Sequence, residues 1–481
     1  MLKINEIRMD YEKEQIGITH VPEFSWTLES DKRNVIQDTW ELEIAEDKAF
    51  EKKIYESGRV NSDASAQILP ENVKLESQKK YFARVKATAN GEETEWVETS
   101  FVTGILDNRE WKAVFVSAEE EADKDNSKGT YVRNEFTVEK PVKEAFVSVT
   151  ALGLYHFYVN GRKVGKDELT PGWTSYRKHL CFQTYEVTDY LKEGKNAAGA
   201  VLAAGWYKGK MGFEGLEKRR NHYGENTALL AQMVIRYEDG TEELFVTDES
   251  WSGADAPVVF AEIYDGEIYG AKEIIGWSEA GCTAGQWKPV RKLDYDFSVL
   301  TGQGSGKVSL MDEVKPKEIF ETPEGDLVID FGQNMSALIQ VTATGKKGDV
   351  IRLDCFEVLD SKGNVYLDNL RGAKESLQYT FGEDGTITYR PSFPFMGFRY
   401  AKIVSFPGTP EPGNFIAHAI HTNMERTGFL ETSNPDLNQL AHNILWGLKS
   451  NFVDVPTDCP QRDERLGWTG DAEIFCRTAC F

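Results

Sequence analysis

Apolar and polar positions alternate along most of the chain. Up to about residue 425, short runs such as WELEIAE, KKYFARVKATA and HFYVNG follow this pattern, and glycine, asparagine, aspartate or proline bounds them. Alternation with turn residues at both ends predicts half-buried β-strands. Because no amphipathic helices are predicted between these strands, the pattern favours β-sandwiches or jelly rolls over a parallel α/β sheet.

After residue 425 the period becomes helical. Apolar residues recur every three or four positions from Leu437 to Leu448, and Ser433 or Asn434 is placed to cap the first turn of this predicted helix. We expect a second helix to begin near Asp471 and to run through AEIFCRTACF without a C-terminal cap. Two helices cannot bury their own apolar faces, so we expect a domain that is cut short and exposes an apolar surface.

Three breaks divide the chain into four modules. The strand-like VETSFVTGIL gives way to polar residues near residue 105, the glycine-rich TGQGSGKV surrounds residue 303, and the helical period follows residue 424. We therefore expect three β modules, over 1–105, 106–303 and 304–424, and the beginning of an all-α domain over 425–481. The expected fold class is multidomain and mainly β.

Composition restricts the partners and the location. The formal net charge of −23 would repel nucleic-acid phosphate or an anionic membrane, but it does not disfavour a neutral sugar. No run approaches the roughly 18 apolar residues that span a bilayer. The first residues lack the basic and apolar segments of a secretory signal, so we expect a cytoplasmic protein.

No metal site is expected. The six cysteines are sparse and form no CxxC pair, which indicates reduced structural thiols rather than a disulfide framework or a zinc site. His418 and His421 lie in a strand-like stretch, where a spacing of three residues places them on opposite faces. Serine-nucleophile, P-loop and dinucleotide motifs are absent from the sequence as well.

The segment between the two predicted helices, DVPTDCPQRDERLGWTGD, carries the candidate chemistry. Its prolines and glycines predict a structured loop, and it concentrates carboxylates, arginines and one tryptophan. Carboxylates and guanidinium groups can hydrogen-bond sugar hydroxyls, while an indole stacks on a pyranose ring. A carboxyl group crowded by acids can keep its proton and act as a general acid, although nearby arginines lower its pKa. The alternative is a solvated, charged turn.

This loop closely resembles the signature of the bacterial α-L-rhamnosidases of glycoside hydrolase family 78. Upstream, FYVNGRKVGKDELTPGW and AAGWYKGK resemble the family's jelly-roll N-terminal module. DFGQNMSALIQV and PSFPFMGFRYAKI are similar to its concanavalin-like sandwich, and FSW with EWVETSF to a fibronectin-type or immunoglobulin-like first domain. The resemblance covers nearly the whole chain and implies that residues 425–481 begin a toroid of six α-helical hairpins.

The resemblance also implies an inverting hydrolysis of terminal α-L-rhamnose, with Glu464 matching the general acid. The residues that match positions holding rhamnose or tuning the acid are Asp458, Arg462, Asp463, Trp468 and Asp471. The family's general base lies on a later part of the toroid, beyond Phe481. We therefore expect the chain as given to be inactive.

The jelly roll offers an accessory sugar site as an alternative to a purely scaffolding role, since some family members carry a rhamnose-binding, calcium-dependent jelly roll. The candidate residues are Asn160, Trp173, Trp206, Tyr207, Asp265 and Glu267. No cofactor is expected to be required, and a structural calcium is the one ion left open.

The expected partners are rhamnose-containing glycosides or oligosaccharides, without a nucleic acid or a membrane, and an oligomer is left open. Two other functions are kept as alternatives. One is a non-catalytic carbohydrate-binding protein made of β-sandwiches, and the other is a related toroid glycosidase with a different sugar specificity.

Overall fold

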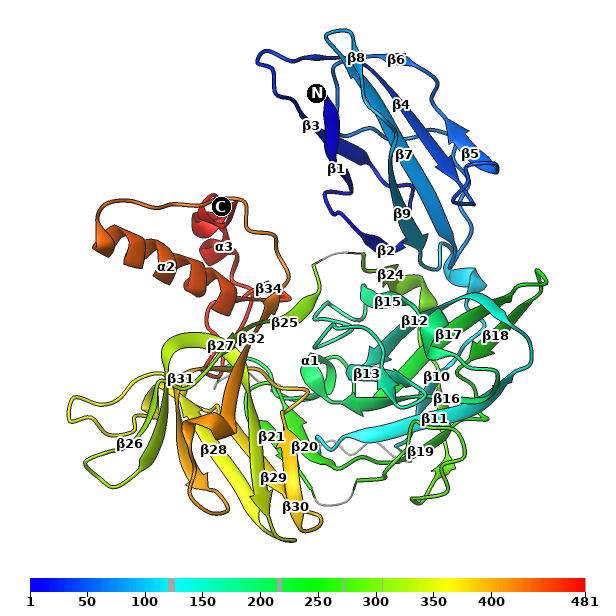
Figure 1. The fold of residues 1–481 in the computed structure, drawn as a ribbon. Helices are drawn as coiled ribbons and strands as arrows, with labels where there is room; N and C mark the ends of the chain where they lie inside the picture. Colours follow the sequence, from blue (N-terminus) through cyan, green and yellow to red (C-terminus); the bar gives the residue numbers. More distant parts are fainter. Residues whose placement is uncertain (120–125, 214–218, 271–272, 305, 481) are drawn as a thin grey trace.

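Strands make up most of the regular structure, as the alternating pattern predicts, and the two longer helices follow residue 434. The computed structural model describes residues 1–119, 126–213, 219–270, 273–304 and 306–480. Three β modules and a short helical part follow one another along the chain (Figure 1). The expected fold class, mainly β with a helical part at the end, is confirmed, and the first helix of that part begins at Pro435.

The first module packs a two-stranded sheet, β1 with β3, beside a sheet ordered β2-β9-β7-β4-β5, with β6 and β8 at its edges. Its strands are β1 (Lys3–Met9), β2 (Gln15–Ile18), β3 (Phe24–Glu29), β4 (Gln37–Ala45), β5 (Lys53–Glu56), β6 (Val60–Asn61), β7 (Lys80–Ala89), β8 (Glu92–Glu93) and β9 (Val97–Thr103). Burial alternates strictly along β7, which gives the sheet one core face. Trp26 and Trp40 meet edge to face in that core, with ring centroids 5.7 Å apart.

The second module has two facing sheets, ordered β23-β10-β17-β12-β15-β24 with β18 beside β17, and β14-β13-β16-β11-β19-β22. Its elements are β10 (Phe115–Ser117), β11 (Thr130–Val138), β12 (Val142–Leu152), β13 (Leu154–Val159), β14 (Arg162–Lys163), β15 (Leu180–Glu186), β16 (Gly194–Ala203), α1 (Gly205–Lys208), β17 (Ala228–Tyr237), β18 (Glu242–Val246), β19 (Ser252–Asp255), β22 (Lys288–Pro289), β23 (Arg291–Leu293) and β24 (Leu300–Gly302). Apolar side chains of both sheets fill the space between them, Val147 and Phe157 among them.

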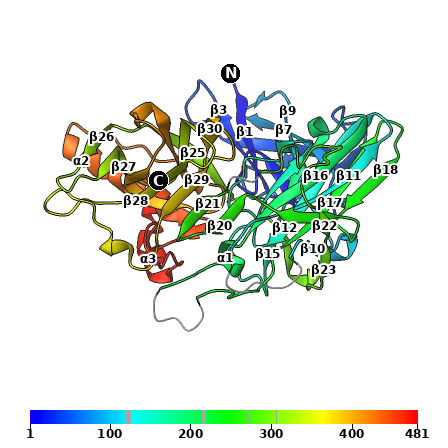
Figure 2. The same ribbon diagram turned by 90° about the horizontal axis from the view of Figure 1, so that it is seen from below.

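The third module is a ten-stranded sheet that includes two strands from the range expected for the second module. Its strands are β20 (Val258–Glu262), β21 (Gly266–Tyr269), β25 (Val308–Val314), β26 (Glu318–Glu321), β27 (Leu327–Gly345), β28 (Val350–Phe356), β29 (Ser376–Thr380), β30 (Gly385–Tyr389), β31 (Met396–Ser405) and β32 (Phe415–Thr422). The β20–β21 hairpin joins through a parallel pairing of β21 with β29. Both views show this hairpin between the second module and the rest of the third sheet (Figure 1, Figure 2).

The helical part consists of α2 (Pro435–Ser450), a hairpin of β33 (Phe452–Val453) and β34 (Val455–Pro456), and α3 (Thr469–Phe475). Asn434 caps α2, since its side chain accepts a hydrogen bond from the backbone of Asp436. The second helix is shorter than expected, because it ends at Phe475 and a 3-10 turn follows; Phe481 lies outside the described residues. No helix in the described part of the chain is long and apolar enough to cross a membrane.

One face of α2 packs on the third module and the other is open. Trp446 packs against the hydrophobic core that the second and third modules share, and His442 Nε2 lies 3.0 Å from Oε1 of Gln333 on β27. Leu440 and Ile444, on the opposite face, are 53% and 40% exposed. The apolar stripe that predicts the helix therefore faces away from the β module.

Short 3-10 turns in the described residues lie at Asn108–Glu110, Thr188–Tyr190, Phe297–Val299, Asp368–Leu370, Pro412–Asn414 and Thr478–Cys480.

Candidate active site

The loop between β34 and α3 is closed by its own backbone. Asp458 N–H donates to the Leu466 carbonyl at 3.1 Å, and Leu466 N–H donates back to Asp458 Oδ1 at 2.9 Å. This reciprocal pair ties residues 458–466 into a ring, so the segment is not a free, solvated turn. The carboxylate that makes the contact is only 7% exposed.

Arg465 roots this ring in the β modules. Its side chain is 0% exposed and donates to the carbonyl oxygens of Ile263, at 3.0 Å, and Phe395, at 2.6 Å. It also pairs with the buried carboxylate of Glu375. Burial raises the pKa of Glu375 well above its ordinary value, and the charge of Arg465 opposes that rise. The loop is thereby fixed to residues of the β modules that precede it by about 70 to 200 residues along the chain.

Glu464, the expected general acid, is 16% exposed and is held at both carboxylate oxygens. Oε2 accepts hydrogen bonds from Arg371 Nη2 at 2.8 Å and from Arg462 Nε at 3.1 Å. Oε1 accepts one from Trp468 Nε1 at 3.2 Å. Burial raises the pKa of Glu464, but the hydrogen bond from Arg371 and the charges of the two arginines outweigh burial and hold the pKa below its ordinary value.

Asp463 points away from Glu464 into the protein and joins three modules. Its side chain is 1% exposed, and Oδ2 accepts a hydrogen bond from Arg219 of the second module at 2.8 Å. Oδ1 forms an ion pair with Arg371 Nε of the third module at 3.0 Å. Asp463 therefore serves to anchor the loop and to orient Arg371, rather than to meet a sugar directly.

Arg462 neutralises the acids beside it. Its Nη2 donates to Asp458 Oδ2 at 3.3 Å, while its Nε donates to Glu464. Asp458, Cys459 and Glu464 each place a ligand atom within 4.8 Å of the others, which is the spacing of a cation site. Because the Arg462 guanidinium already bridges the two carboxylates, we assign no metal there.

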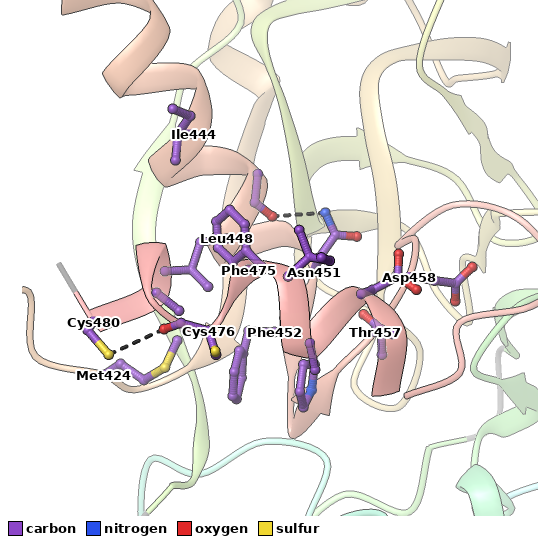
Figure 3. Close-up of a pocket in the computed structure, with 17 residues that line it drawn as sticks. Met424, Ile444, Leu448, Asn451, Phe452, Thr457, Asp458, Phe475, Cys476 and Cys480 are labelled. Atoms are coloured by element: carbon purple, nitrogen blue, oxygen red, sulfur yellow. Dashed lines mark hydrogen bonds between the residues drawn. The ribbon is translucent and has the colours of Figure 1, made fainter. Parts of the chain in front are cut away.

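Of the remaining predicted residues, Asp471 borders an open groove and Trp468 lies exposed beside Glu464. Trp468 is 43% exposed, and Asp471 lies exposed in the first turn of α3. The groove has a volume of about 790 Å³ and is lined by α2, β33 and α3, with Asp458 and Asp471 among its walls. Leu448 and Phe475 face it from the two helices, and Asp458 stands at its far end (Figure 3). The loop thus brings Glu464 together with Arg462 and Trp468, and through Arg462 with Asp458, while Asp463 is turned inward and Asp471 lies in the groove wall.

The residues expected to form an accessory sugar site do not share a surface, and the structure argues against that site. Trp206, Tyr207, Asp265 and Glu267 are buried. Glu267 accepts hydrogen bonds from Tyr389 and from two backbone N–H groups, so its carboxylate is fully used inside the third module. Buried rings and carboxylates cannot meet a polysaccharide from solvent.

The other two candidates for that site also have structural roles. Asn160 has a φ of +48° in the turn between β13 and β14. Its side-chain amide nitrogen donates hydrogen bonds to Tyr190 O and Asn196 Oδ1. Trp173 stacks on Trp206 with ring centroids 5.9 Å apart. Such contacts are typical of a scaffold.

Several residues that hold the loop are not predictable from the loop motif. Arg371, Arg219 and Glu375 come from the β modules, and Tyr264 donates its hydroxyl to the Glu464 carbonyl at 2.7 Å. Asp454 at the start of the loop accepts a hydrogen bond from Trp173 N–H of the second module. No local signal marks the β-module residues, because their partners lie 90 or more residues away.

Models of protein families match four consecutive parts of the chain. They are described as a Rha78A-like N-terminal immunoglobulin domain over 4–107, an alpha-L-rhamnosidase N-terminal domain over 140–312, a bacterial alpha-L-rhamnosidase concanavalin-like domain over 320–421 and a bacterial alpha-L-rhamnosidase 6 hairpin glycosidase domain over 425–481.

Curated relatives carry the same name. The chain is 42% identical over 358 residues to an alpha-L-rhamnosidase of Streptomyces avermitilis, a match that covers 74% of this chain and 34% of that protein. It is 34% identical over 472 residues to one from an Alteromonas species, covering 94% of this chain and 51% of the relative. The chain therefore spans about half, or less, of the length of these relatives.

Solved structures agree over the full chain. The alpha-L-rhamnosidase from Aspergillus terreus superposes with a TM-score of 0.94 at 34% identity, covering 100% of this chain and 56% of that one. The Streptomyces avermitilis enzyme in complex with L-rhamnose superposes with a TM-score of 0.94 at 28% identity, covering 100% and 63%. By the order of its modules, its fold and its sequence, the chain belongs to the bacterial α-L-rhamnosidase family, glycoside hydrolase family 78.

Proposed function

We propose that the loop 458–471 forms the acid side of a site that hydrolyses terminal α-L-rhamnosides with inversion. The observation that carries this proposal is the setting of Glu464. One oxygen of its carboxyl group is held by two guanidinium groups, and the other bonds an exposed indole. A carboxyl group fixed in this way can deliver a proton to a sugar without reorienting.

In the proposed reaction, Glu464 protonates the departing glycosidic oxygen while water attacks the anomeric carbon from the opposite face. The carboxylate that remains is stabilised by Arg371 and Arg462. Trp468 walls the sugar pocket, while Asp458 and Asp471 offer acceptors to the sugar hydroxyls. No organic cofactor takes part.

An inverting mechanism needs a second carboxylate to activate the water. Asp458 does not suit this role, because it is bonded to Arg462 and to the Leu466 backbone on the side of Glu464. We propose that a segment of the relatives' length that this chain does not span supplies the base. The chain as given would then hydrolyse no glycoside by itself.

The test measures release of p-nitrophenol from p-nitrophenyl α-L-rhamnoside. It compares this chain, a protein extended to the end of its gene, and the extended protein with Glu464→Gln or Glu473→Gln, the second being an exposed acid on α3. We expect activity in the extended protein and in the E473Q variant alone. A proton NMR spectrum recorded during the reaction reads the anomer that is released first.

A folded extended protein that is silent on this substrate would contradict the rhamnose specificity. In that outcome, binding of sugars by the β modules without hydrolysis becomes the better account. Equal activity in the E464Q and E473Q variants would refute the role of Glu464.

A further inference from the structure

Arg371 lies in the third β module, 93 residues before Glu464 along the chain, yet it contacts the expected acid directly. We propose that Arg371 is a positioning residue for Glu464, which fixes the carboxyl group so that Oε1 is the oxygen that donates the proton. This inference rests on the proposed function, and its test is chosen to be read without catalysis.

The contacts of Arg371 form a fork around two consecutive loop residues. Its Nη2 donates to Glu464 Oε2 at 2.8 Å and to the Asp463 carbonyl, and its Nε pairs with Asp463 Oδ1 at 3.0 Å. One planar guanidinium thus fixes both the backbone and the side chain of the loop where the acid sits. A lysine ammonium lacks the planar fork that directs separate N–H donors to these acceptors.

The backbone around Arg371 is built to bring it there. Its φ of +55° lies in the region that side chains other than glycine rarely adopt, at the end of the 3-10 turn Asp368–Leu370. The next residue, Gly372, approaches Asp463 so closely that an added Cβ would lie 2.6 Å from Oδ2. A side chain at this position would therefore have to displace the Asp463 carboxylate, which is held by Arg219 and Arg371.

The number of donors at each oxygen decides where the proton resides. Oε2 accepts from Arg371 and Arg462, and neither guanidinium can accept a hydrogen bond in return. Oε2 already accepts two donors, whereas Oε1 accepts only the Trp468 N–H, so the neutral acid carries its proton on Oε1, directed away from that N–H. When it transfers, the Oε1–H bond breaks and a bond to the glycosidic oxygen forms. That oxygen keeps the electron pair of the broken C–O bond, and the charge remains on a carboxylate that both arginines stabilise.

Charged groups of both signs surround Glu464 besides Arg371. Arg462 and Asp458 face it from the loop, and Asp463 stands behind it, paired with Arg219. Glu357 of the third module faces Arg462, and burial raises the pKa of Glu357 above its ordinary value. Since removal of Arg371 takes away one of two cations that touch the carboxylate, Glu464 should then hold its proton to higher pH.

A fluorescence titration of this chain tests the contact without any substrate. Trp468 bonds the Glu464 carboxyl, so its emission changes when that carboxyl loses its proton. The signal is the difference between the chain and its W468F variant, followed against pH while circular dichroism confirms folding. The E464Q variant should remove the transition and so identifies it.

We expect the midpoint to rise in R371M and to stay close to that of the unsubstituted chain in R371K, which keeps the charge. Arg352 supplies the matched control. It lies in the same module, is 46% exposed against 43% for Arg371 and also pairs with a carboxylate. The R352M variant should leave the midpoint unchanged. Equal midpoints in R371M and R352M would overturn the proposal.

A second variant serves if R371M does not fold. Gly372→Ala keeps the guanidinium but pushes the turn away from Asp463, and we expect it to raise the midpoint as well. An unmoved midpoint in a folded G372A variant overturns the proposal.

In the extended enzyme, the pH at which kcat/KM falls should rise in R371M, and kcat should fall more than KM changes. The outcomes separate the two proposals. Activity that survives E464Q refutes the proposed role of the acid, whereas a midpoint that ignores Arg371 refutes only the present inference.

Discussion

At the scale of single residues, the loop depends on a buried arginine of its own whose partners belong to the β modules. Arg465 has no exposed side-chain surface and uses its guanidinium to bind two carbonyl oxygens and Glu375. Water cannot replace these partners. Arg465 therefore anchors the loop to the β modules, while Arg371 fixes the carboxyl group of Glu464.

Replacing Arg465 with methionine should strongly destabilise the loop. The change leaves the buried Glu375 without its cation, and breaking a buried pair in this way costs roughly 3–5 kcal/mol. The E375Q variant keeps an acceptor for Arg465 and should lose less. Hydrogen exchange of the backbone over 458–466 measures the loss of protection in both variants. Similar protection in R465M and in the unsubstituted chain would refute the anchoring role.

The sequence predicts the loop residues but not what they touch. One motif contains Glu464, Trp468 and Asp458, which makes them recognisable from the sequence. In the structure, Trp468 donates a hydrogen bond to Glu464. Arg371 and Arg219 lie 93 and 244 residues from their loop partners. Such contacts depend on how whole modules pack, and no local pattern encodes that.

At the scale of elements, α2 shows that a sequence pattern predicts the apolar face of a helix but not the partner on which the helix packs. The spacing of Leu440 and Ile444 correctly predicts a helix and its apolar stripe, and Asn434 caps it as expected. The stripe nevertheless stays open, because the other face makes the contacts: Trp446 packs against the hydrophobic core and His442 contacts Gln333 of β27. A one-sequence pattern indicates amphipathicity and leaves the partner unspecified.

Two substitutions on α2 should therefore differ. Leu440→Ser removes an exposed side chain and should change the stability of the helix by no more than about 0.5 kcal/mol. Trp446→Ser removes packing against the core and should cost roughly 2 kcal/mol, less than a fully buried tryptophan. Hydrogen exchange across α2 compares them. L440S should also lower the binding of an apolar dye; equal losses of protection would contradict the assignment of faces.

The β33–β34 hairpin carries a pH-dependent contact. Asp454 accepts the N–H of Trp173, and burial raises its pKa from 3.8 to about 6, against that hydrogen bond. A raised pKa in the folded state means that this group contributes stability below about pH 3.8, which is lost as the pH rises through about 6. Partial exposure of the residue to water reduces the effect below the roughly 3 kcal/mol that two pKa units represent.

Asp454→Asn should remove this dependence. Asparagine still accepts the Trp173 N–H and tolerates the φ of +69° at this position. The melting temperature of D454N relative to the unsubstituted chain should therefore rise between pH 4 and pH 7.5. Asp436→Asn, at an exposed acid of α2, controls for the loss of one charge. A difference that is constant across pH would count against the contact.

At the scale of the whole molecule, the β modules are parts of the site rather than appendages. The second module contributes Arg219 and the N–H of Trp173, and the third contributes Arg371 and Glu375. Composition and alternation predict the β modules and their order. They do not predict that β20 and β21 leave the second module's range for the third sheet, since the pairing of β21 with β29 joins residues about 110 positions apart.

Because β20 and β21 belong to the third sheet, the structure predicts where the chain can be truncated. A chain beginning at residue 304 lacks β20 and β21, so β29 loses its neighbour at one edge of the third sheet. We expect it to unfold without a cooperative transition, whereas a chain beginning at residue 257 should melt cooperatively. Calorimetry measures both. Equally sharp transitions would show that the hairpin is dispensable for the third module.

If Glu464 donates a proton to the leaving group, the loss of activity in E464Q must depend on how much that leaving group needs the proton. The measurement is kcat/KM of the extended enzyme and of its E464Q variant on rhamnosides of 2,4-dinitrophenol, p-nitrophenol and a simple alcohol. A leaving group that departs without a proton needs no acid. The account predicts that E464Q loses little on the dinitrophenyl substrate, more on the nitrophenyl substrate and nearly all activity on the alkyl substrate. The same loss on all three would contradict it.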